Sequence, residues 1–173
     1  MNKNPDAKDT KMPFELIIRK ARTEDAKDIL QIHQHSTGLL LRDYKPEQVA
    51  CWVPANRTAD YYIQEIENPD NTCLIAEIDG KAIAFAVANG NYINKLYTHA
   101  DYNGYGAGRK IFEQIENLIR KANYSKIILN STLTSVGFYQ HMGMVILDRV
   151  PYQFDNGVSV DIVKMEKNLE QKS

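Results

Sequence analysis

The pattern of apolar and polar positions predicts short strands separated by turns. Runs of apolar and β-branched residues predict strands over residues 16–20, 72–77 and 81–88, one directly before residue 99 and one from residue 127. Asp79-Gly80 lies between two of these runs and predicts a hairpin turn, and Asp155-Asn156-Gly157 predicts a second hairpin. The remaining connections are long enough to hold helices.

The helical spacing of apolar residues predicts helices in those connections. Thr23 is expected to cap a first helix that ends around residues 36–38, and further helices are predicted over 45–53 and 58–66. The most regular helix begins near Gly108, and its apolar face consists of Ile111, Ile115, Leu118, Ile119 and Ala122. This alternation predicts an α/β fold with a mixed central sheet and helices on its faces.

Composition and charge narrow the classes of function. The 173 residues suffice for one domain, expected over residues 14–169 between a disordered leader at 1–13 and a frayed tail at 170–173. The net charge is −1, and basic and acidic residues are interspersed, so the sequence shows no basic patch of the kind that binds nucleic acids. The longest apolar run, residues 82–88, is too short to cross a membrane, and the N-terminus lacks the apolar core of a signal peptide. A cytoplasmic protein is therefore expected.

No metal site is predicted. His33 and His35 are two residues apart, so they cannot share one face of a helix. Cys51 and Cys73 are too few for a disulfide framework or a metal site and are expected to be buried apolar side chains.

Three glycines, Gly104, Gly106 and Gly108, stand between a predicted strand and the most regular helix. Such a segment can cradle a phosphate, because the first helical turn presents unpaired N–H groups and glycines let a diphosphate approach the backbone closely. A P-loop would end in Gly-Lys-Ser/Thr, and the dinucleotide fingerprint would need glycine at the position of Arg109. Glycine spacing alone leaves open a phosphate loop of another kind and a structural turn.

Two blocks resemble the GNAT family of N-acetyltransferases. Asn103-x-x-Gly106-x-Gly108 is similar to the family's Gln/Arg-x-x-Gly-x-Gly/Ala acyl-CoA loop, with asparagine in the first position. Residues 127–144 resemble the family's next strand and its Phe-Tyr-x-x-x-Gly-Phe helix. The resemblance covers about residues 16–168 and implies a single-domain GNAT fold. It also implies that the glycine-loop strand and the strand at Ile127 splay apart to admit a pantetheine arm.

The resemblance implies acetyl-CoA as the acetyl donor. It points to a set of cofactor-binding residues: Leu96, Tyr97, Thr98, Asn103, Gly104, Tyr105, Gly106, Ala107, Gly108, Arg109 and Asn130. The loop would bind phosphate, the strand would align the pantetheine, and a backbone N–H at or near Tyr97 would meet the oxyanion. For Asn130, formation of a turn is an equally good interpretation.

Tyr139 stands at the family's tyrosine beside the CoA sulfur, which implies a catalytic role. A phenol with an ordinary pKa near 10 can donate a proton to a thiolate leaving group, although a packed core tyrosine is the structural alternative. For the base, Glu77, His33 and Asp101 are all candidates, and water can also take the proton. The resemblance thus implies acetyl transfer to a primary amine. Because the sequence offers no cysteine or serine in a convincing base-paired setting, direct attack in a ternary complex is expected rather than an acyl-enzyme. A non-catalytic acyl-CoA-binding sensor or regulatory module is the alternative.

The acceptor amine is expected to meet aromatic walls contributed by Tyr44, Trp52, Tyr61 and Tyr62, although Trp52 also fits a core position. The lack of a large acidic cluster there argues against polycationic substrates. Whether the amine belongs to a small molecule or a protein stays open, as does the oligomeric state, a homodimer included.

Overall fold

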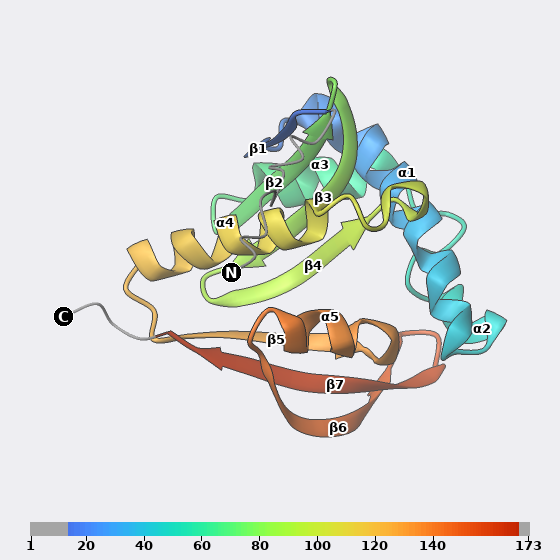
Figure 1. The fold of residues 1–173 in the computed structure, drawn as a ribbon. Helices are drawn as coiled ribbons and strands as arrows, with labels where there is room; N and C mark the ends of the chain where they lie inside the picture. The colour runs from blue at the N-terminus through green and yellow to red at the C-terminus, as the bar shows by residue number, and fades with distance from the viewer. Residues whose placement is uncertain (1–13, 170–173) are drawn as a thin grey trace, which may run out of the picture.

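One mixed β-sheet organises the part of the chain that the computed structural model describes, residues 14–169 (Figure 1). Seven strands of these residues form it in the order β1-β2-β3-β4-β5-β7-β6. Their bounds are β1 Leu16–Lys20, β2 Asn71–Ile78, β3 Lys81–Asn89, β4 Tyr92–Thr98, β5 Lys126–Thr132, β6 Val145–Gln153 and β7 Ser159–Asn168. The β4–β5 pair is parallel and the other pairs are antiparallel. The predicted leader and tail lie outside the described residues.

Both predicted hairpins are confirmed. Strands β2 and β3 pair across Asp79 and Gly80, whose φ angles of 50° and 77° are the left-handed values that a two-residue hairpin turn requires. Strands β6 and β7 pair in the same antiparallel manner on either side of Gly157, which has a φ of 84°. Glycine adopts this backbone region without steric cost and aspartate tolerates it, so these short sequences mark turns.

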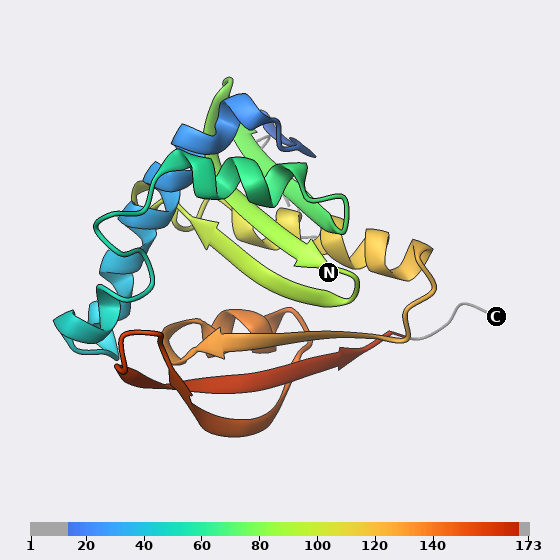
Figure 2. The ribbon, with the colours of Figure 1, turned by 180° about the vertical axis from the view of Figure 1, so that it is seen from behind.

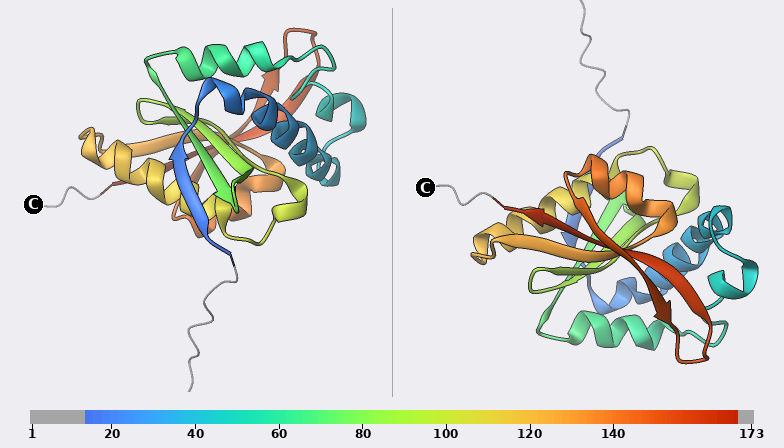
Figure 3. Two further views of the ribbon diagram at one scale, coloured as in Figure 1. Left: turned by 90° about the horizontal axis from the view of Figure 1, so that it is seen from above. Right: turned by 90° about the horizontal axis from the view of Figure 1, so that it is seen from below.

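Helices cover both faces of the sheet, as the fold class requires (Figures 1 and 2). Helices α1 (Ala26–Thr37) and α3 (Ala59–Glu67) lie on one face, and α4 (Ala107–Lys121) and α5 (Val136–His141) lie on the other. Figure 3 shows α3 and α4 on opposite sides of strands β1–β3. None of the helices in residues 14–169 is long and apolar enough to cross a membrane.

Two hydrophobic clusters fill the space between the sheet and these helices. Because side chains alternate along a strand, Ile75 and Phe85 join the cluster that contains α1 and α3, whereas the neighbouring Ala76 and Ala84 join the cluster that contains α4. All four side chains have no solvent exposure. Burial on both faces explains why the centre of β3 is continuously apolar.

The start of the first helix differs from the prediction. Residues Thr23–Asp25 form a 3₁₀ turn ahead of α1, and Thr23 makes no capping hydrogen bond. Instead the Asp25 carboxylate accepts the backbone N–H of Arg22 at 2.6 Å. Arg19 donates to both oxygens of the same carboxylate at 2.7 Å, and this bidentate pair holds the pKa of Asp25 below its usual value. The carboxylate thus fixes the residue ahead of the 3₁₀ turn, and no side chain caps the first N–H groups of α1.

The second predicted helix is shorter than expected. Instead of spanning residues 45–53, it forms α2 (Pro46–Val49), and turns follow. The turns bring the Trp52 ring within 4.8 Å of Tyr44 and 5.2 Å of Phe154 on the β6–β7 hairpin. Aromatic packing against a distant segment therefore overrides the local helical spacing. The third helix, predicted over 58–66, is confirmed by α3.

Strands β4 and β5 separate soon after they begin. They pair only at Tyr92 with Ile128 and at Ile93 with Leu129, and the rest of each strand has no partner in the other. Strand β4 continues alongside β3, while β5 pairs along its whole length with β7, so each strand follows its own half of the sheet. The resulting wedge is visible in Figure 1, and it confirms the splay that the sequence led us to expect.

Candidate functional site

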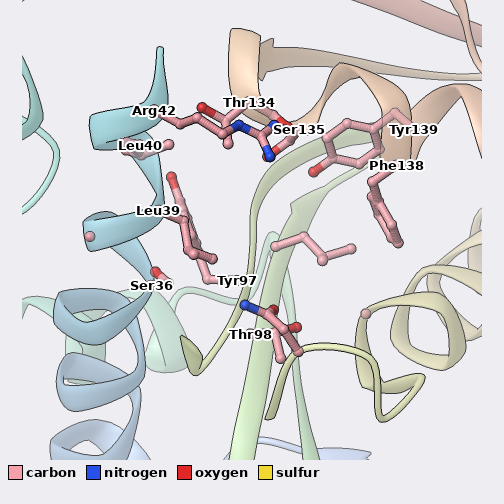
Figure 4. A pocket seen from close by; sticks show the side chains of 14 residues that line it. Ser36, Leu39, Leu40, Arg42, Tyr97, Thr98, Thr134, Ser135, Phe138 and Tyr139 are labelled. Atoms are coloured by element: carbon pink, nitrogen blue, oxygen red, sulfur yellow. Dashed lines mark hydrogen bonds between the residues drawn. The ribbon is translucent and has the colours of Figure 1, made fainter. Parts of the chain in front are cut away.

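A first cavity of about 560 Å³ lies beside the end of β4 and is lined by residues of both α4 and α5. Its walls come from the end of α1, the 3₁₀ segment η2 (Gly38–Arg42), β4, the glycine segment, η4 (Leu133–Ser135) and α5. Predicted site residues that line it are Leu96, Tyr97, Thr98, Asn103, Gly108 and Tyr139. The topology thus brings the strand, the loop and the tyrosine, which are distant in sequence, around one space (Figure 4).

The glycine segment ends in an uncapped helix N-terminus. Gly106 is the N-cap of α4, has a φ of 81° and makes no side-chain capping bond. Gly104 has a φ of 86°, so both residues adopt the left-handed region that favours glycine. The first turn of α4 contains no acidic residue, and its N–H groups have no partner within the helix. This end of α4 has the chemistry of an anion site.

Gly108 serves a different purpose from the other two glycines. Its φ is not positive, and a Cβ added there would meet Phe138 and the Thr98 hydroxyl at 3.5 Å. The absence of a side chain therefore keeps space open inside the first cavity, between β4 and α5, rather than relieving backbone strain.

Other members of the predicted cofactor-binding set lie around this cavity rather than in its wall. Ala107 is the first residue of α4 and is buried, whereas Gly104, Tyr105 and Gly106 are exposed on the loop. Arg109 faces a separate surface cavity beside α4, where it donates to Glu113 at 2.8 Å.

Tyr139 presents its hydroxyl to the first cavity (Figure 4). Its ring packs against Phe138, with 5.1 Å between centroids, and against Phe112, with 6.3 Å, and the residue is 7% exposed. Burial raises the pKa of this phenol well above its ordinary value. Tyr139 therefore keeps its proton throughout the physiological pH range and can act as a donor.

A second cavity of about 660 Å³ opens on the opposite side of β4. Its wall is rich in aromatic residues, contributed by Trp52, Tyr61, Tyr92, Tyr97, Tyr152 and Phe154. Asn130 also lines it and does not line the first cavity, although the sequence grouped this residue with the pantetheine contacts. Of the four aromatic residues expected around the acceptor, Trp52 and Tyr61 line this cavity.

The other two of those aromatic residues are buried. Tyr62 is 1% exposed, and Tyr44 is 7% exposed. The Tyr44 hydroxyl donates to the Asp161 carbonyl at 2.7 Å and accepts the Leu133 N–H at 2.8 Å. Tyr44 therefore joins the segment after α1 to the β5–β7 half of the sheet, because its hydroxyl both donates and accepts a hydrogen bond there.

The two cavities share Tyr97, which lines both. Its ring lies 4.0 Å from the imidazole of His33 and 5.7 Å from Phe85, measured between centroids. Burial raises the pKa of the Tyr97 phenol, so this side chain is neutral. Between Asn94 and Thr98 the β4 edge that faces β5 has no strand partner. A group in the first cavity and a group in the second can therefore approach each other at this edge.

Among the three candidate bases, His33 alone lines either cavity. Glu77 lies on β2, where it accepts from Arg19 at 2.8 Å. The Asp101 side chain is 82% exposed. Desolvation, with the nearby charges of Lys95 and Arg57, lowers the pKa of His33 to about 3. His33 is therefore neutral at physiological pH and is a weak base.

Sequence reasoning missed one wall of the first cavity. The end of α1 and the segment η2 contribute Ser36, Gly38, Leu39, Leu40 and Arg42. A signal was present, because Leu39 and Leu41 are 45% and 53% exposed while Leu40 between them is buried. Three consecutive leucines cannot all face the core of a short helical segment, so some of them had to line a surface or a cavity.

Comparison with known proteins agrees with this architecture. A family model described as an acetyltransferase (GNAT) domain matches residues 40–169. An uncharacterized acetyltransferase of Streptococcus pyogenes serotype M3 is 29% identical over 83 residues, which are 45% of this chain. The match spans only 57% of that relative's length.

Solved structures share the fold at low sequence identity. A GCN5-related N-acetyltransferase from Rhodopseudomonas palustris has a TM-score of 0.83 at 24% identity, covering 88% of this chain and 95% of that one. The PaiA N-acetyltransferase from Thermoplasma acidophilum, solved in complex with coenzyme A, has a TM-score of 0.69 at 21% identity, covering 90% and 99%. Because the family model covers most of the chain, this protein belongs to the GNAT family of acetyltransferases.

Proposed function

We propose that this protein transfers an acetyl group from acetyl-CoA to a primary amine by direct attack in a ternary complex. The observation that carries the proposal is the meeting of two cavities at Tyr97, with the uncapped end of α4 and the Tyr139 hydroxyl on one side. Direct attack requires donor and acceptor to be bound together within reach of each other. Two cavities that share one strand edge provide that arrangement.

The first cavity suits an acyl-CoA. The N–H groups at Gly106 and the first turn of α4 bind its diphosphate, and the unpaired edge of β4 aligns the pantetheine amides as a neighbouring strand would. When bound, acetyl-CoA supplies an activated thioester. A backbone N–H at or near Tyr97 receives the developing oxyanion, and Tyr139 donates a proton to the departing sulfur. The proton that the amine loses passes to water, and solvent restores the proton of Tyr139.

A direct mechanism is favoured over an acyl-enzyme by the state of the cysteines. Cys73 is buried and lines neither cavity, and its burial raises the thiol pKa to about 11, which disfavours a thiolate. Cys51 lines the second cavity, but its sulfur contacts the Glu47 carbonyl at 3.3 Å and the Asn156 amide at 3.3 Å. No base activates either thiol among the contacts of the described residues.

The test is a calorimetric titration with acetyl-CoA, CoA and ATP, followed by transfer assays on a panel of amines. We expect saturable binding of about one equivalent of the CoA forms, no binding of ATP, and CoA release that depends on an amine. Binding without transfer to any amine would favour the non-catalytic acyl-CoA-binding module. Absence of binding would reduce the glycine segment to a structural turn.

Replacing Gly106 by alanine is expected to weaken acetyl-CoA binding about tenfold. The added methyl group would lie where the phosphates approach the amides, which weakens binding, whereas the left-handed backbone costs an alanine roughly 1–2 kcal/mol of stability. Gly80→Ala is the matched control, because Gly80 has a similar φ of 77° and equally open surroundings but lies in the β2–β3 turn. Calorimetry and thermal melts should show similar destabilisation in both variants and lost affinity in Gly106→Ala only. Equal affinities would place the diphosphate elsewhere.

A further inference from the structure

The second cavity contains a cation that no carboxylate neutralises. Arg57 lines the cavity and lies over the ring of Tyr61 at 3.9 Å, and within residues 14–169 it forms no ion pair. The other cation in the wall, Lys95, is paired with Glu65 at 2.9 Å. Asp155 is the carboxylate of the wall, and it is exposed on the β6–β7 hairpin. The interior of the cavity is therefore electropositive.

The same cavity contains an unused hydrogen-bond donor. The Tyr62 hydroxyl is buried, and its polar neighbours are Arg57 and the Nδ1 atom of His33 at 2.8 Å. A guanidinium can only donate, so the tyrosine proton must go to His33 Nδ1. The other ring nitrogen of this neutral imidazole, Nε2, then carries a hydrogen. Within the described residues, Nε2 of His33 is the buried side-chain nitrogen or oxygen without a partner.

Arg57 and His33 thus both lie beside the hydroxyl of Tyr62, which is hydrogen-bonded to His33. Both are donors, and neither has an anionic or neutral acceptor that satisfies it in the cavity wall. Burying an unsatisfied donor costs free energy that a bound acceptor would recover. An oxyanion offers several lone pairs and neutralises the charge of Arg57, so it is the group that fits this pair.

The position of His33 also restricts the shape of the ligand. The residue is 3% exposed, and its ring lies 4.0 Å from the ring of Tyr97, tilted by 36°, at the point where the two cavities meet. An oxyanion on His33 therefore lies close to the place where an acceptor amine must react. The amine itself is kept from the Tyr61 end, because Arg57 covers that ring and Lys95 lies 5.3 Å from its centroid.

We propose that the second cavity selects an acceptor whose amine lies within a few bonds of an oxyanion, with an apolar body that contacts the aromatic wall. Amino acids with large apolar side chains, and their phosphonate counterparts, have this chemistry. Arg57 and the Nε2–H of His33 bind the oxyanion, and the amine lies at Tyr97. This inference rests on the proposed acetyl transfer, because that reaction requires an amine in the second cavity.

The test uses acceptors that share one aromatic body. Phenylalanine carries a carboxylate, 1-amino-2-phenylethylphosphonate carries a phosphonate, and phenylalaninamide and 2-phenylethylamine carry no oxyanion. The amines differ in intrinsic reactivity, so the relevant quantity is how a variant changes the ratio of kcat/KM between acceptors. In Arg57→Gln the preference for the oxyanion-bearing acceptors is expected to fall at least about tenfold. Lys27→Gln removes an exposed cation of α1 that lines neither cavity, and it should leave the ratio unchanged.

A second measurement does not depend on turnover. In the presence of CoA, N-acetylphenylalanine should bind the wild-type protein more tightly than N-acetylphenylalaninamide, and Arg57→Gln should abolish the difference. If no amine is acetylated but this preference is found, the transfer reaction fails while the oxyanion site stands. If amines are acetylated but Arg57→Gln changes neither the kcat/KM ratio nor the binding preference, the oxyanion site is wrong. A preference for the phosphonate over the carboxylate would assign the site to amines that also carry a phosphonate or phosphate group.

Discussion

Tyr139→Phe is expected to lower kcat about 100-fold while changing the affinity for acetyl-CoA less than about threefold. The phenol opens on the first cavity and its raised pKa keeps it protonated, so it can donate to the leaving sulfur but adds little to binding. Phenylalanine keeps the ring contacts with Phe138 and Phe112 and removes only the hydroxyl. Steady-state kinetics together with calorimetry separate the two effects.

Tyr124→Phe supplies the control for this change. Tyr124 is 42% exposed, follows α4 and lines neither cavity at the wedge, so its hydroxyl can be removed without affecting turnover. A loss of thermal stability in Tyr139→Phe with unchanged kcat would make Tyr139 a packing residue. A parallel rise in KM for acetyl-CoA with unchanged kcat would make it a binding residue.

The second large effect concerns stability at acid pH. The pKa of His33 is about 3 in the folded protein and about 6.5 in the unfolded chain, so the unfolded state binds the proton first. The corresponding stability is present above pH 6.5 and is lost as the pH falls toward 3. At pH 5 the loss from this one group is about 2 kcal/mol relative to pH 7.5. Urea unfolding of the wild-type protein and of His33→Gln at both pH values measures it.

His33→Gln should lose about 2 kcal/mol less than the wild-type protein between pH 7.5 and pH 5, because glutamine does not titrate. His141→Gln replaces an exposed histidine of α5 and should keep the full wild-type dependence. The comparison is not taken below pH 5, because the carboxylate of Asp25, whose pKa is lowered by Arg19, remains ionised in this range. Identical pH profiles for wild type and His33→Gln would contradict the burial of a neutral imidazole.

Much of the fold could be predicted because its signals are local. The strand at residues 16–20, the hairpin at Asp79-Gly80 and the helix after Gly106 each depend on periodicity or on the backbone freedom of a few residues. The predictions failed where a distant partner decides the local structure. Arg19 and the Arg22 N–H hold Asp25 at the helix start, where a Thr23 cap was expected, and Phe154 packs on Trp52 where a continued helix was expected.

The candidate site divides in the same way. The glycine segment and Tyr139 belong to sequence blocks that resemble a family, so the amino-acid sequence alone is enough to point to them. The residues of the proposed oxyanion site come from separate elements, His33 from α1, Tyr62 from α3 and Arg57 from the segment before α3, and no spacing rule links them. Asn130 illustrates the remaining difficulty. Alternation along β5 places it on the same face as Thr132, but only the fold shows that this face lines the second cavity.

The brief contact between β4 and β5 also has a mechanical consequence. Two register pairs are the whole strand-to-strand connection between the β1–β4 half of the sheet and the β5–β7 half, with Tyr44 as a further tie at the far side. Between the two halves the sheet itself is therefore almost interrupted, and the core around α4 packs against both of them. If the proposed pantetheine arm pairs with the free edge of β4, it adds hydrogen bonds across this seam, so the donor would stabilise the junction between the two halves as well as supply the acetyl group.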